Sequence, residues 1–82
     1  MATVHVRFFA RYAELTGTAT TAVTVPVNAT VSDVLHHVRD IIPGAATLPP
    51  RPLAALNLRQ VRLTATVRDG DEVAFLPPLA GG

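Results

Sequence analysis

The stretch ATVSDVLHHVRDIIPG, residues 29–44, decides the fold, because its apolar residues recur with the period of an α-helix. Thr30 followed three residues later by Asp33 is a capping-box pattern, which favours a helix start at this point. Pro43 and Gly44 are expected to end the helix. The residues that fall on one stripe of this helix are Val31, Val34, Leu35, Val38, Ile41 and Ile42. We therefore predict a helix that packs this stripe against a sheet.

The residues before this helix change to a period of two, which is typical of strands with one buried face. TVHVRFFA, residues 3–10, alternates in this way, and TTAVTV, residues 20–25, is rich in β-branched side chains. Between them, RYAELTG, residues 11–17, predicts one helical turn closed by Gly17. The short connection favours an antiparallel hairpin.

The residues after the helix predict a loop and three strands. AATLPPRP, residues 45–52, reads as a loop because its prolines lack the N–H donor that regular structure needs. LAALNL, residues 53–58, and QVRLTA, residues 60–65, predict strands joined by a turn at residues 57–59. A turn at Asp69 and Gly70 leads to the last strand, EVAFL, residues 72–76.

This order of elements predicts an α+β fold of the β-grasp type, a mixed sheet of about five strands with one main helix on one face. The first and last strands of such a sheet are central, adjacent and parallel. We expect residues 1–76 to form the domain and residues 77–82 an extended tail. The residues expected in the core are Val4, Val6, Phe8, Val34, Leu35, Val38, Leu56, Val73 and Phe75.

Composition limits the possible functions. The chain has 82 residues, enough for one small domain, and 49% of them are hydrophobic, which favours a packed core. A net charge of +1 argues against nucleic acid as a partner. The sequence contains no apolar run long enough to span a bilayer and no signal-peptide pattern, so a soluble cytoplasmic protein is expected.

The types of residue that are missing exclude several kinds of chemistry. There is no cysteine, which excludes disulfides and thiol catalysis, and all seven basic residues are arginines. His36 and His37 are interpreted as solvated helix surface and not as metal ligands. The acidic residues around Gly70 are interpreted as turn formers and not as a catalytic cluster; they are Asp69, Asp71 and Glu72.

Three stretches together resemble the sulfur-carrier, or small, subunits of molybdopterin synthase, a ubiquitin-like family with the β-grasp fold. They are VRFFARYAELTG, LAALN and DGDEVAFLPPLAGG, and the resemblance covers essentially the whole chain. Thiamine-pathway sulfur carriers share the fold and the tail but typically lack FFARYAELTG. Leu58 stands where the family often has glycine, which predicts a wider turn, and Gln60 and Arg62 replace bulkier apolar residues on the side facing the partner.

The resemblance implies that Gly82 is the reactive residue. Its carboxylate would be adenylated by an ATP-dependent activating enzyme and converted to a thiocarboxylate with sulfur from a sulfurtransferase. The sulfur would then pass to a pterin precursor in the large synthase subunit, with which the chain would form a heterotetramer and in which catalysis is expected. ATP belongs to the activating enzyme, so no cofactor or metal is expected on this chain.

The tail is expected to enter the active sites of partner proteins. Gly81 and Gly82 have no Cβ to clash in a narrow channel, while Pro77 and Pro78 favour an extended exit that reaches about 15 Å beyond the sheet. The residues predicted to contact partners are Phe9, Leu76, Pro77, Pro78 and Leu79, with Phe9 and Leu76 at the centre. Two alternatives remain open: a sulfur carrier for thiamine, cysteine or tRNA thiolation, and a ubiquitin-like protein modifier.

Overall fold

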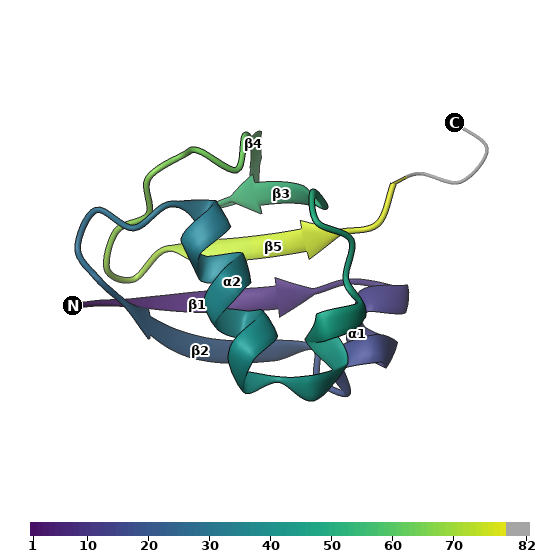
Figure 1. The fold of residues 1–82 in the computed structure, drawn as a ribbon. Coiled ribbons are helices and arrows are strands. Elements are labelled where there is room, and N and C mark those ends of the chain that lie inside the picture. The colour runs from purple at the N-terminus through teal and green to yellow at the C-terminus, as the bar shows by residue number, and fades with distance from the viewer. Residues whose placement is uncertain (79–82) are drawn as a thin grey trace.

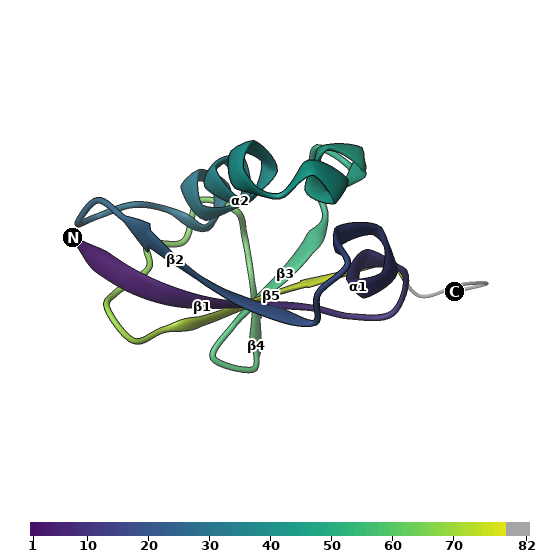
Figure 2. The same ribbon diagram turned by 90° about the horizontal axis from the view of Figure 1, so that it is seen from below.

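The computed structural model describes residues 1–78, which form one mixed sheet with helices on one face (Figures 1 and 2). The sheet has five strands in the order β2-β1-β5-β3-β4, which is the predicted β-grasp arrangement. In chain order the elements are β1 (Ala2–Phe8), α1 (Arg11–Thr16), β2 (Thr20–Val25), α2 (Val31–Ile41), the 3-10 helix η1 (Pro43–Thr47), β3 (Leu53–Leu56), β4 (Arg59–Val61) and β5 (Glu72–Leu76).

The pairing of the strands places the first strand, β1, and the last, β5, inside the sheet. β1 pairs with β2 in the predicted antiparallel hairpin, and with β5 in parallel. Because parallel strands run in one direction, the C-terminal ends of β1 and β5 lie at the same end of the sheet (Figure 1). β3 runs antiparallel to β5 and to β4, so the start of β3 lies beside the end of β5.

The start of α2 has the predicted capping box. The Asp33 amide donates to Thr30 Oγ1 over 3.2 Å, and the Thr30 amide donates to Asp33 Oδ2 over 2.9 Å. The helix ends at Ile41, whose side chain is 51% exposed, so the predicted stripe is one residue too long. Ile42 is half-buried against the core, because the chain turns there into η1.

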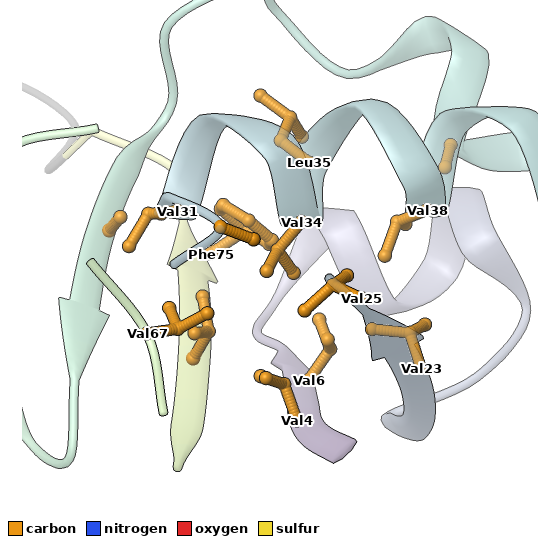
Figure 3. Close-up of a cluster of buried hydrophobic side chains, with 14 of the residues drawn as sticks. Val4, Val6, Val23, Val25, Val31, Val34, Leu35, Val38, Val67 and Phe75 are labelled. Carbon is orange, nitrogen blue, oxygen red and sulfur yellow. The ribbon is translucent and has the colours of Figure 1, made fainter. Parts of the chain in front are cut away.

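The core fills the space between the sheet and α2, where apolar side chains from both layers meet (Figure 3). Phe75 of β5 is fully buried, and its ring stacks on that of Phe8 with centroids 6.3 Å apart. Of the predicted core residues, only Leu56 is merely half-buried. The core also includes residues that the sequence did not single out, among them Ala2, Tyr12, Val23, Val25, Ala45, Leu48, Ala54 and Val67.

The segment after α2 is more regular than predicted. Residues 45–47 belong to η1 and are not loop, because Pro43 takes the first position of a helical turn, where a missing N–H does no harm. A Cβ built on Gly44 would lie 1.8 Å from the carbonyl oxygen of Leu15 in α1. The close contact between η1 and α1 therefore requires glycine at this position.

The β3–β4 connection is tighter than predicted. Leu56 pairs with Arg59, so the loop consists of Asn57 and Leu58 alone. Both residues have positive φ, 50° and 71°, as a two-residue type I′ turn requires. Asn57 tolerates this conformation, and its side-chain oxygen accepts a hydrogen bond of 2.9 Å from the Glu72 amide in β5. The expectation of a wider turn is therefore wrong: Leu58 adopts the left-handed conformation.

The strand predicted at residues 60–65 is also too long, because β4 pairs only over Arg59–Val61. The backbone beyond it bonds elsewhere: the carbonyls of Leu63 and Ala65 accept from Ser32 and Val31 at the start of α2.

None of the helices in the described part of the chain is long and apolar enough to cross a membrane.

Candidate functional site

The tail leaves the domain from β5, which has a partner strand on each side. Phe75 pairs with Phe8 in β1, and Leu76 pairs with Leu53 in β3. Pro77 follows the end of the strand and is half-buried, whereas Pro78 is exposed. The base of the tail is therefore fixed by the sheet. The predicted residues Leu79, Gly81 and Gly82 lie outside the described residues.

The sheet has an open face, the one opposite α2 (Figure 2). At its tail end the register sets three large apolar residues next to one another. Leu53 pairs with Leu76, and Phe9 follows Phe8 at the position that continues the β1–β5 register to Leu76. We call Phe9, Leu76 and Leu53 the tail-end row. Phe9 and Leu76 are half-buried, and Leu53 is 41% exposed.

The contact between Arg7 and Phe9 shows on which face of the sheet Phe9 lies. Val6 and Phe8 are buried, so the alternation of β1 places Arg7 on the open face. The Arg7 guanidinium lies 5.1 Å from the centroid of the Phe9 ring, so Phe9 is on that face too. Arg7 Nη1 also contacts Glu72 Oε1 at 3.3 Å. Both side chains are partly exposed, so this ion pair contributes about 1 kcal/mol at most and serves mainly to orient Arg7.

A second row crosses the open face further from the tail and is much less apolar. Gln60 pairs with Ala55, Ala55 with Ala74, and Ala74 with Arg7. The two alanines form a shallow floor, and Gln60 and Arg7 stand at its ends. The large apolar side chains of the open face are therefore concentrated at the end of the sheet where the tail leaves.

A groove of about 680 Å³ flanks the other side of the tail base, between α1 and the prolines. Its lining includes Tyr12, Pro49, Pro77 and Pro78. Arg39 of α2 holds this wall in place, because its Nη2 donates to the carbonyl oxygens of Leu48 and Pro49. The proline-rich segment thus supports the base of the tail.

Asp69 and Asp71 form the turn at Gly70, as predicted, whereas Glu72 is the first residue of β5 and its carboxylate contacts Arg7. Asp69 Oδ1 accepts from the Thr3 amide over 2.8 Å, and Asp71 Oδ2 accepts from the Arg68 amide over 2.8 Å. Gly70 has φ of 86°, which favours glycine. These carboxylates are engaged by backbone donors and lie at the opposite end of β5 from the tail.

The two adjacent histidines lie on α2, where His36 is exposed and His37 is half-buried. Among residues 1–78, no three His, Asp or Glu side chains gather closely enough to hold a metal ion. What the described residues offer beside the base of the tail is thus an apolar surface suited to binding.

Leu53 is the residue of this surface that sequence reasoning missed. The alternation in LAAL already separates Leu53 and Ala55 from Ala54 and Leu56, so the face of Leu53 could have been found. Its neighbour could not, because the antiparallel register that sets Leu53 beside Leu76 joins residues 23 positions apart in the sequence.

Comparison with known proteins gives a match over nearly the whole chain. The model of the ThiS family matches residues 6–82. A curated relative from Drosophila erecta, "Molybdopterin synthase sulfur carrier subunit", is 38% identical over 82 aligned positions, which cover 96% of this chain and 90% of the relative.

Solved structures agree with the fold. The crystal structure of SAMP1 from Haloferax volcanii, a small archaeal modifier protein, has a TM-score of 0.86 at 28% identity and covers 99% of this chain and 100% of that one. A Helicobacter pylori structure described as a complex of subunits 1 and 2 of molybdopterin-converting factor has a TM-score of 0.71. It covers 98% of this chain and 99% of that one, and at 22% identity it shows the fold alone.

Proposed function

The chain belongs to the ThiS family, and from this premise we propose that it is the sulfur carrier for molybdopterin, the pterin of the molybdenum cofactor. The observation that carries the proposal is the 38% identity, over 96% of the chain, to a relative named as the sulfur carrier subunit of molybdopterin synthase. The family match extends to Gly82, so it includes the residue proposed to carry the sulfur.

The absence of cysteine directs the chemistry to a carboxylate. A free carboxylate is a poor electrophile, so the Gly82 carboxylate first attacks the α-phosphate of ATP on an activating enzyme, which releases pyrophosphate and leaves an acyl adenylate. Sulfur at the oxidation level of hydrosulfide, supplied through a sulfurtransferase, then attacks the carbonyl carbon. A C–S bond forms, the C–O bond to AMP breaks, and Gly82 becomes a thiocarboxylate.

The large synthase subunit is the proposed partner to which this chain delivers sulfur. It holds the pterin precursor and carries out the catalysis, while this chain supplies sulfur as a donor subunit. The tail-end row supports this division of roles, because it gathers apolar side chains beside the tail and away from the engaged carboxylates. Two glycines at positions 81 and 82 let the backbone pass a narrow channel without a Cβ clash.

The proposal is tested by loading and transfer with purified proteins. The chain is incubated with the activating enzyme, ATP and a sulfurtransferase, and its intact mass is measured. We expect a gain equal to the difference between sulfur and oxygen, located at Gly82 by fragmentation. The loaded chain is then mixed with the large subunit and a cyclic pterin precursor, and we expect each loaded chain to deliver its one sulfur atom to the pterin in a single turnover. A loaded chain that delivers no sulfur to the pterin would contradict the proposal.

Replacing Phe9 or Leu76 with Asp should weaken binding to the large subunit and to the activating enzyme. Each change sets a charge in the middle of the tail-end row, and apolar anchors of this kind contribute about 2 kcal/mol or more to binding. Calorimetry should show Kd raised on the order of thirtyfold. Val27→Asp is the matched control, because Val27 is 66% exposed and lies near the start of β1, at the end remote from the tail. Parental affinity in both row variants would show that docking occurs elsewhere.

A second candidate function is protein modification, which the likeness to the small archaeal modifier SAMP1 favours. The acyl adenylate at Gly82 would then be attacked by a lysine amine of a target, so that an isopeptide bond forms and AMP leaves. This chain has no lysine, so it cannot be extended into side-chain-linked chains of itself. Lysine-linked adducts in the loading reaction, without pterin conversion, would favour this function over the first. Transfer to a thiamine, cysteine or tRNA acceptor would instead indicate a carrier of another pathway.

A further inference from the structure

The segment that forms η1, β3 and β4 carries positive charge only. Residues 41–68 contain no aspartate or glutamate, so all six acidic residues of the chain lie outside them. In a chain with a net charge of +1, this uneven distribution concentrates positive charge on one stretch of the sequence. The arginines of the segment are Arg51, Arg59, Arg62 and Arg68.

Two of these arginines flank an apolar groove. Arg51 and Arg62 both line a groove of about 490 Å³, and both are exposed. The apolar part of its lining comes from Leu53, Ala54, Val61 and Leu63. Within residues 1–78 the one ion pair joins Arg7 to Glu72, so neither groove arginine pairs with a carboxylate there. The groove thus combines an apolar floor with two cations that are available to a partner.

The groove is continuous with the tail-end row. Leu53 belongs to both, because it pairs with Leu76 on one side and lines the groove on the other. Ala54 pairs with Val61 at the last position of the β3–β4 register, and Leu53 and Arg62, the residues next to this pair, both line the groove. Apolar surface therefore runs from Phe9 through Leu76 and Leu53 into the groove and ends at the arginines.

We propose that this groove receives an acidic segment of the large synthase subunit. An apolar side chain of that segment packs on Leu53, and carboxylates next to it pair with Arg51 and Arg62. The inference rests on the proposed function and adds to it a second contact, which an interface of ordinary size needs. Stable interfaces bury about 800 Å² per partner, more than three partly covered side chains in a row provide. Unlike charges across the contact also speed association and select the partner.

The test is the rate of association of the full chain with the purified large subunit over a range of salt concentrations. The variant is the double charge reversal Arg51→Glu/Arg62→Glu. We expect its association rate to fall about tenfold or more at low salt, with a weaker dependence on salt than the parent shows. Arg68→Glu is the matched control, since Arg68 lies in the same basic segment but beside Met1 and Val27, at the opposite end of the sheet. It should associate at nearly the parental rate.

The outcomes separate this inference from the function on which it rests. A double variant with the parental rate and salt dependence overturns the groove contact, while sulfur transfer by the parent would still support the carrier function. If Arg68→Glu lowers the association rate as much as the double variant does, the effect comes from net charge alone, and the groove contact is again overturned. If the double variant associates more slowly only with the activating enzyme, the assignment of the groove to the large subunit is overturned. A parent that neither binds the large subunit nor transfers sulfur refutes the proposed function itself. Thermal unfolding of each variant verifies that the fold is intact.

Discussion

Deleting Gly82 should abolish sulfur transfer and leave the stability of the domain unchanged. The deletion leaves a carboxylate on Gly81, but this carboxylate sits about 3.3 Å short of the position that the parental terminus reaches. Active sites tolerate little displacement, since an error of about 1 Å can lower a rate a hundredfold. We therefore expect single-turnover transfer to the pterin to fall by at least about a hundredfold.

Two controls separate length from composition. Ala80→Gly keeps the length of the tail and removes only one methyl group, so it should transfer sulfur at close to the parental rate. One glycine added after Gly82 moves the carboxylate in the other direction and should be as defective as the deletion. A deletion variant that still transfers sulfur would contradict the assignment of the reactive group to Gly82.

Truncating Phe75 to alanine should destabilise the fold by about 3 to 5 kcal/mol. The side chain is fully buried between the sheet and α2, and its ring stacks on Phe8. Its removal loses that contact and leaves a cavity that the strands on either side of β5 cannot close, because both are bonded to it. The expected loss is large against the 5–15 kcal/mol that stabilises a typical domain.

Urea unfolding measures this effect through a lower midpoint at an unchanged slope. The matched control is Leu58→Ala, because Leu58 is 87% exposed and its truncation leaves no cavity. The control should stay within about 0.5 kcal/mol of the parent. A Phe75→Ala variant that unfolds at the parental midpoint would mean that the two faces of β5 have been assigned the wrong way round.

The sequence by itself determined the elements whose signals are local. The change of period at residues 29–44 gave α2, and Thr30 with Asp33 gave its first turn, because capping joins residues three positions apart. β2 was predicted with its observed bounds. Gly17, with φ of 75°, closes α1 as expected, since glycine reaches the left-handed region without steric cost. The alternation of β1 and β5 also fixed which side chains face the core.

The tertiary structure alone decided what depends on contacts between distant residues. Ile41 fits the helical stripe but is exposed, because the stripe cannot tell where the sheet beneath it ends. Leu58 adopts positive φ because strand pairing on both sides leaves a loop of two residues, which overrides its local preference. β4 stops at Val61 because the next carbonyls bond to α2.

The candidate site divides in the same way. The outward face of Phe9 and Leu76 could be predicted, since alternation is a property of short stretches, while the role of the tail residues stays a prediction. The place of Leu53 beside Leu76 and the arginine-lined groove could not be predicted, because they depend on which residues of β3, β4 and β5 stand opposite one another. A shift of one residue in that register would turn Leu53 to the other face, and the register is set by burial of the whole sheet against α2.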